Sequence, residues 1–128
     1  MKEIVQYDPP RPYARASRVG NLICLAGETG ELSDATKHVH GDIVQQTEAV
    51  FENIRGSLAL FGASFDDLVR MDVFLVDREH RKPFMEVLRR YMPGGAPPGA
   101  MVCVKELLHE GMLVEVEVIA AAPEKKEV

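Results

Sequence analysis

The spacing of apolar residues between positions 42 and 61 constrains the fold more than any other feature of this sequence. They recur every three or four positions, the period of an α-helix with one buried face: Ile43, Thr47, Val50, Ile54, Leu58 and Phe61. Asp42 suits the N-cap of this helix, and Gly62 suits the position just after its end. A second amphipathic helix is predicted over about residues 78–92, with Asp77 as its cap. Pro83 fits either the first turns of this helix or a break between a short turn and the helix proper.

Strand-like segments lie on either side of both helices. The run 22–26 is apolar throughout and follows a Gly20-Asn21 turn, as expected for a buried strand after a hairpin. Residues 68–76 alternate in polarity and predict a strand that buries one side chain in two: Val69, Met71, Val73 and Leu75. Further strands are expected over residues 4–7, 14–19, 100–108 and 113–121, and loops over 28–41 and 93–99.

Two helices cannot cover both faces of a sheet of this size, so the element order predicts an α+β two-layer sandwich. We expect a five- to six-stranded mixed sheet with both helices on one face. The second face is predicted to mix apolar and charged side chains: Phe74, Val76 and Cys103 beside Arg70, Asp72 and Glu115. Such a face is too apolar for solvent, and burial against copies of the same chain fits it best.

Length and charge limit the remaining possibilities. The 128 residues suit a single domain over 1–128, with a frayed charged tail at 123–128. The net charge of −5 makes nucleic acid an unlikely partner. We expect no signal peptide and no membrane-spanning segment, hence a cytoplasmic protein. Cys24 and Cys103 lie in apolar runs and are interpreted as free, buried thiols.

Several segments together resemble one known family. They are Tyr13 after a proline-rich start, Gly20-Asn21-Leu22-Ile23, Ala26-Gly27, Gln46-Thr47 to Asn53-Ile54, Gly62-Ala63-Ser64, Val73 to Asp77, and Val114 to Ala120. In this order and spacing they are similar to the YjgF/Rid family of reactive intermediate deaminases. The resemblance covers essentially the whole chain. It implies a chorismate-mutase-like fold and a homotrimer with three ligand clefts between subunits.

The resemblance also implies an activity and a site. Active members hydrolyse enamines and imines such as 2-aminoacrylate to keto acids and ammonia, without a cofactor. By position, Glu115 corresponds to the residue that organises water, Tyr13 to the tyrosine of the cleft and Gly27 to its glycine. The family's carboxylate-binding arginine is replaced, because its Pro-Ala-Arg-(Ser/Thr) motif reads Pro97-Pro98-Gly99-Ala100 here, with Gly99 at the position of the arginine. Gly99 and Ala100 are therefore expected to line a cleft that lacks the usual cation.

Arg81 and Arg15 are the candidates to replace that cation, although both also suit ordinary surface positions. Cys103 follows the cleft loop and is kept as a substrate-binding candidate. His38 and His40 form a His-x-His pair without a third ligand, so no metal site is predicted.

Three functions remain open. The first is a cofactor-free imine or enamine hydrolase acting on a small-molecule substrate, with weak activity on 2-aminoacrylate because Gly99 cannot hold a carboxylate. The alternative is a trimer that binds or senses a small molecule without catalysis. The third is an endoribonuclease or translation inhibitor, for which Arg89-Arg90 is part of the only basic cluster, but net charge and the absence of tryptophan oppose it.

Overall fold

The computed structural model describes residues 2–30 and 41–123. The strands are β1 (Lys2–Val5), β2 (Ala16–Val19), β3 (Leu22–Leu25), β4 (Glu28–Thr29), β5 (Leu68–Leu75), β6 (Met101–Cys103) and β7 (Val114–Ala121). The helices are α1 (Ile43–Ala59) and α2 (Arg81–Tyr91), each with a short 3₁₀ turn nearby, at Phe65–Asp67 and Arg78–His80.

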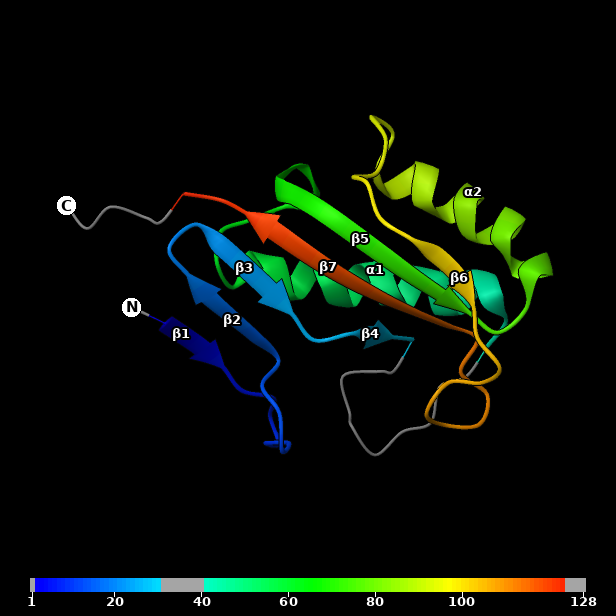
Figure 1. Ribbon diagram of the computed structural model, residues 1–128, viewed down its shortest axis with the longest axis horizontal. Helices are drawn as coiled ribbons and strands as arrows, with labels where there is room; N and C mark the ends of the chain where they lie inside the picture. Colours follow the sequence, from blue (N-terminus) through cyan, green and yellow to red (C-terminus); the bar gives the residue numbers. More distant parts are fainter. Residues whose placement is uncertain (1, 31–40, 124–128) are drawn as a thin grey trace.

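All seven strands join one mixed sheet in the order β1-β2-β3-β7-β5-β6, with β4 also paired to β7 (Figure 1). Only β5 and β6 run parallel, and the other pairs are antiparallel. Figure 1 shows α1 behind β7 and β5, and α2 beside the β6 edge. The second face of the sheet carries no helix from the described part of the chain.

One hydrophobic core joins the helices to the sheet. Alternate residues of β5 and β7 point into it, and α1 and α2 supply the opposing apolar faces: Met71, Val73 and Leu75; Val114, Val116 and Val118; Val50, Phe51 and Ile54; Phe84, Val87 and Leu88. The predicted α+β two-layer architecture is confirmed, but the sheet has seven strands rather than five or six, because residues 28–29, expected in a loop, pair with β7 as β4. The N-terminus of α1 is as predicted, because the Asp42 carboxylate accepts a hydrogen bond from Gln45 N and the side-chain oxygen of Gln45 accepts one from Asp42 N.

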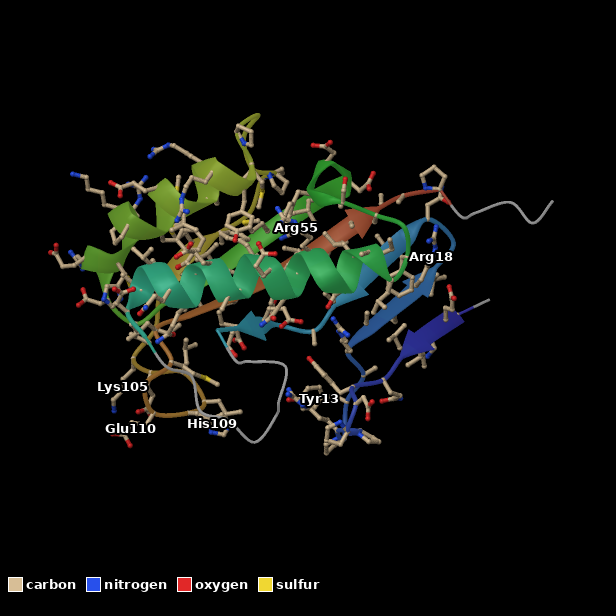
Figure 2. All side chains as sticks on the ribbon, turned by 180° about the vertical axis from the view of Figure 1, so that it is seen from behind. Tyr13, Arg18, Arg55, Lys105, His109 and Glu110 are labelled. Carbon is tan, nitrogen blue, oxygen red and sulfur yellow. The ribbon has the colours of Figure 1, made fainter. Side chains whose placement is uncertain are left out.

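A buried arginine ties the β2–β3 hairpin to the rest of the core. The Arg18 side chain is only 5% exposed and points to the helix side of the sheet (Figure 2). It donates hydrogen bonds to the carbonyl oxygens of Gly20, Phe61 and Ala122 at 2.9, 3.4 and 2.7 Å. These contacts satisfy a charge that burial would otherwise destabilise.

The prediction that Val69 faces the core is wrong. Val69 is 46% exposed, whereas Leu68 is buried in its place. The register between β5 and β7 shifts between Leu68 and Arg70, so Val69 is the extra residue of a β-bulge. A bulge shifts by one position which side chains of the strand face the core. A residue pattern alone does not show where a bulge occurs.

Two further expectations need correction, and the structure selects one of the two arrangements left open for the second helix. The strand predicted over 100–108 ends at Cys103, and the chain then loops away until β7. Cys103 pairs with Leu75 of β5, so its side chain is on the helix side of the sheet and not on the open face. The second helix is divided into the 3₁₀ turn, which Asp77 caps, and α2 proper. Neither helix of the described residues is long and apolar enough to span a membrane.

Candidate functional site

Glu115 lies on the open face of the sheet, at the start of β7. It alternates with the buried Val114 and Val116, and its backbone pairs with Phe74 of β5 and Thr29 of β4. A Cβ atom placed on Gly27 would be 3.1 Å from Oε1 of Glu115. The carboxylate therefore lies directly against the bare backbone of Gly27. A side chain at residue 27 would crowd this carboxylate.

Tyr13 belongs to a cluster in the segment between β1 and β2 (Figure 2). It is 54% exposed, and its ring meets the Tyr7 ring edge-on with centroids 5.8 Å apart. The Arg11 guanidinium lies 4.0 Å from the centroid of the same Tyr7 ring. Burial and then the negative charge of Glu28 raise the pKa of Tyr7 to about 12, which keeps this phenol protonated at neutral pH. Glu28 follows Gly27 directly, so the cluster lies next to the Glu115 site.

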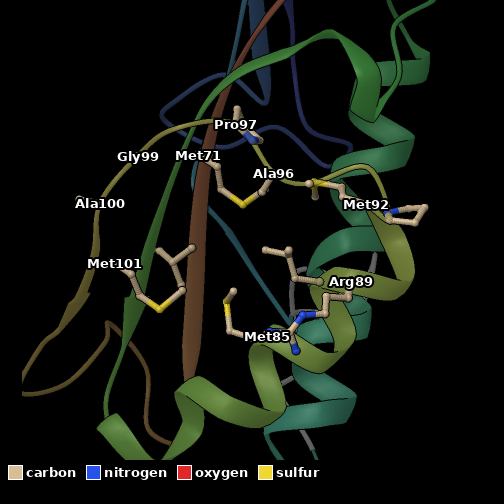
Figure 3. Close-up of a pocket in the computed structure, with 13 residues that line it drawn as sticks. Met71, Met85, Arg89, Met92, Ala96, Pro97, Gly99, Ala100 and Met101 are labelled. Atoms are coloured by element: carbon tan, nitrogen blue, oxygen red, sulfur yellow. The ribbon is translucent and has the colours of Figure 1, made fainter.

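Gly99 and Ala100 line a separate cavity of about 490 Å³ on the helix side of the sheet. The cavity lies between α2, the 93–100 loop and the paired strands β5 and β6 (Figure 3). Four methionines line it, from all of these elements except the loop itself: Met71, Met85, Met92 and Met101. This volume falls in the usual range of small-molecule sites.

Gly99 is bound so tightly to β5 that no other residue fits in this backbone. A Cβ atom on Gly99 would overlap the carbonyl oxygen of Met71. On either side of Gly99, Pro98 O accepts a hydrogen bond from Met71 N at 3.0 Å and Ala100 O accepts one from Val73 N at 2.8 Å. The resemblance implied an arginine at position 99, and this geometry explains why the position cannot simply be restored by substitution.

Asp72 fixes the same loop from the open face. Its carboxylate accepts a hydrogen bond from Ala100 N at 2.8 Å, and it holds both Nε and Nη2 of Arg70 at 3.0 Å. The backbone hydrogen bond from Ala100, followed by that from Arg70, lowers the pKa of Asp72. Glu117 pairs directly opposite Asp72 on β7. The positive charge of Arg70 is therefore engaged by the negative charges of Asp72 and the neighbouring Glu117.

The other predicted residues do not reach the cavity. Arg81 is exposed at the first position of α2 and does not line the cavity. Arg15 donates to Ser57 Oγ at 2.9 Å, on α1. Both cysteines are free, but neither is fully buried as predicted: Cys103 is exposed because it lies on the edge strand, and Cys24 is half-buried. His38 and His40 lie outside the described residues. Within the described ranges, no group of three His, Cys, Asp or Glu side chains is placed to hold a metal ion.

Sequence reasoning missed the cation that does line the cavity, Arg89 of α2. In Figure 3 its guanidinium extends toward the same space as the Met85 side chain. The signal was present in the sequence, since Arg89 follows Met85 by four residues and such pairs share one helix face. Arg89 was instead grouped with Arg90 as part of a surface basic cluster.

The two groups of residues lie on opposite faces of the sheet. The cavity is bounded by Met71 and Val73, which point toward the helices, whereas Glu115 points away from them. A ligand bound in the cavity therefore has the sheet between itself and Glu115 of the same chain. Chemistry that uses both needs a second copy.

The comparisons with known proteins agree on one family. The family model described as Endoribonuclease L-PSP matches residues 4–122. The chain is 37% identical to a RutC family protein of Pyrococcus abyssi over 88% of this chain and 87% of the relative. It is 29% identical to Reactive Intermediate Deaminase A, chloroplastic, of Arabidopsis thaliana over 85% of this chain and 58% of that protein. The crystal structure of RidA from an Antarctic Psychrobacter superposes with a TM-score of 0.80 at 30% identity, covering 88% of this chain and 89% of that one. On this evidence the chain belongs to the YjgF/RutC/Rid family.

Proposed function

We propose that this protein is a cytoplasmic, cofactor-free hydrolase that converts reactive imines or enamines to carbonyl compounds and ammonia. The observation that carries the proposal is the Glu115 carboxylate, held against bare backbone at Gly27 on a sheet face that no described helix covers. The names of the Arabidopsis relative, which is similar in sequence, and of the Psychrobacter relative, which is similar in structure, support the same reaction class.

The chemistry needs one group that accepts and returns a proton. Water adds its oxygen to the carbon of the protonated imine, C=NH2⁺, while Glu115 accepts one of the water protons. The carbon now bears a hydroxyl and an amino group. Glu115 returns the proton to the nitrogen and then accepts the hydroxyl proton as the C=O bond forms and the C–N bond breaks, which releases ammonia. A carboxylate in general acid–base roles of this kind contributes about 10²–10⁴-fold.

The complete site is proposed to lie between copies of the chain in a homotrimer, each cleft combining the cavity of one copy with Glu115 of its neighbour. Exposed apolar side chains on the open face support such an assembly, because exposed apolar patches mark interaction surfaces: Ile4 at 49%, Val19 at 54%, Leu22 at 47% and Val102 at 42%. Register places all four on the same face as Glu115.

The first test replaces Glu115 by glutamine, which keeps size and polarity but cannot accept the proton. We expect kcat for imine hydrolysis to fall about 10²–10⁴-fold. Glu117→Gln is the matched control, since this carboxylate lies two residues further along the same strand and face and is expected to leave kcat near wild type. Imines are generated in situ, and keto-acid release is measured above the uncatalysed rate. Wild-type kcat in the Glu115→Gln variant would contradict the proposal.

The second test asks whether the site is shared. Met101→Trp fills the cavity, and Glu115→Gln removes the proton acceptor. Each variant alone is expected to be inactive, whereas a mixture refolded together regains activity because some clefts combine two intact halves. Light scattering should give three chains of 14.2 kDa, about 43 kDa. No recovery in a mixture that does form trimers would place both halves in one copy.

Saturable binding of keto acids without turnover of any imine would favour a non-catalytic binding or regulatory trimer instead. RNA cleavage that survives Glu115→Gln would favour the activity that the family model's description names.

A further inference from the structure

Resting on the proposed function, we infer that Arg89 binds the substrate carboxylate and that the methionine-lined cavity receives the substrate's side chain. The preferred substrates are then 2-imino acids with a long or bulky apolar side chain. Of the residues lining the cavity, all of which the structure describes, Arg89 alone is charged. The cavity offers one cationic anchor and an otherwise apolar wall, the combination that matches a carboxylate joined to an apolar group.

Arg89 is free to take this role, whereas Arg81 does not line the cavity and three other arginines are engaged elsewhere. Arg70 is held on two nitrogens by Asp72, and Arg15 donates to Ser57. The next residue, Arg90, pairs with Glu48 at 3.4 Å. Within the described ranges, Arg89 has no ion-pair or hydrogen-bond partner. A guanidinium with unused donors at the rim of a cavity binds a carboxylate through two parallel hydrogen bonds.

The backbone at Gly99 makes a second anchor inside the cavity impossible. A side chain there would overlap the Met71 carbonyl, so a cation cannot reach the cavity from the 93–100 loop at this position. The helix is the other wall, and its face toward the cavity carries Met85 and, one turn later, Arg89. The anchor is therefore provided by α2, while β6 contributes only apolar contact through Met101.

The size of the cavity favours large side chains. At about 30 Å³ per heavy atom, the share of one water molecule in the liquid, 2-aminoacrylate with six heavy atoms fills about 180 Å³, of the roughly 490 Å³ present. On the same measure the imino acids of leucine and phenylalanine, with nine and twelve heavy atoms, fill about 270 and 360 Å³. Flexible thioether side chains adapt to differing apolar shapes, so the four methionines suit a range of such substrates.

The first experiment compares chain lengths in the wild-type protein. The 2-imino acids of alanine, 2-aminobutyrate, norvaline and norleucine are produced in situ, and keto-acid release is followed. Each added methylene that is buried should raise kcat/KM about fourfold, so norleucine, with three more methylenes, should exceed alanine by about sixtyfold. A flat or falling series would overturn the assignment of the cavity to the side chain.

The second experiment tests the anchor with Arg89→Gln, and Arg90→Gln is the matched control with the same change in net charge. For a carboxylate substrate, Arg89→Gln should raise KM about 10- to 30-fold and leave kcat within about threefold, since Arg89 binds but transfers no proton. For an uncharged imine of similar shape, neither variant should change KM. Equal effects of the two variants on the carboxylate substrate would overturn the inference.

Binding measurements separate this inference from the proposed function. Calorimetric titration with the saturated 2-oxo acids needs no turnover. If no imine is hydrolysed but these acids bind more tightly with length and lose about tenfold on Arg89→Gln, the anchor stands and the hydrolase proposal fails. If imines are hydrolysed in a Glu115-dependent manner but Arg89→Gln matches Arg90→Gln in both assays, the reaction stands and the anchor fails.

Discussion

Replacing Gly99 by alanine probes the contact that fixes the wall of the cavity. The added Cβ atom would overlap the Met71 carbonyl oxygen and lie 2.5 Å from its carbon, so the 93–100 loop has to move away from β5. The atoms in conflict belong to backbone on both sides, and no flexible side chain can yield to relieve the overlap. The same movement stretches the two hydrogen bonds on either side of Gly99, from Met71 N and Val73 N.

The cost follows from these two effects. Two backbone hydrogen bonds at about 1 kcal/mol each contribute about 2 kcal/mol, and overpacking in a rigid site adds about 1–3 kcal/mol. The expected loss is therefore about 3–5 kcal/mol in the free energy of unfolding, a large share of the stability of a domain this size. With an unfolding entropy of about 2.1 cal/mol/K per residue, the melting temperature should fall by about 11–19 °C.

The assay is thermal and urea unfolding at one fixed chain concentration, with Gly94→Ala as control. Gly94 lies in the same loop, but a Cβ atom there meets no atom within 4 Å. Its substitution should be neutral or raise the stability by about 0.4–1 kcal/mol through the unfolded chain. If Gly99→Ala melts within about 3 °C of wild type, the loop is not bound to β5 as described, and the reasoning that moves the anchor to α2 fails with it.

Two further predictions concern stability. Arg18→Met should lower the free energy of unfolding by about 2–4 kcal/mol, because three carbonyl oxygens lose a charged donor, two of them in buried surroundings; a loss below about 0.5 kcal/mol in urea unfolding would contradict this. The lowered pKa of Asp72 contributes stability that is present above about pH 4 and lost as pH falls through the folded-state value. Between about pH 4 and 2, the free energy of unfolding of wild type should therefore fall more steeply than that of Asp72→Asn. Parallel curves of this free energy against pH would contradict the hydrogen bond from Ala100 N to the Asp72 carboxylate.

The architecture was predictable because the apolar periods of the elements are regular. Each local pattern is compatible with one structure: the apolar stripe and the Asp42 cap with the helix α1, and the alternating residues with the strand β7. Together these elements are compatible only with a two-layer α+β fold. The prediction failed where a residue pattern is compatible with two geometries. The bulge at Val69 and the early end of β6 at Cys103 depend on strand pairing across the sheet, which a local pattern does not contain.

The candidate site was predictable only in part, for a similar reason. Glu115 and Gly27 came from the resemblance, and the structure does bring them into contact. Arg81 was a poor candidate because the break after Asp77 leaves it at the exposed start of α2. The place of Arg89 in the cavity wall could be recognised only from the fold, which brings Met85 and Arg89 of α2 opposite β5 and β6. In the sequence, a charged residue beside a cavity has the same pattern as an ordinary surface cation.

The closeness of Gly99 to the Met71 carbonyl also has an evolutionary consequence. A side chain at residue 99 would destabilise this backbone, so selection is expected to remove substitutions there. Substitutions that survive selection should therefore accumulate at other residues around the cavity. The rim of α2 is the permissive wall, since Met85 is half-buried and Arg89 exposed. Proteins descended from this chain that prefer other ligands should therefore differ from it on α2, whereas residue 99 should remain glycine.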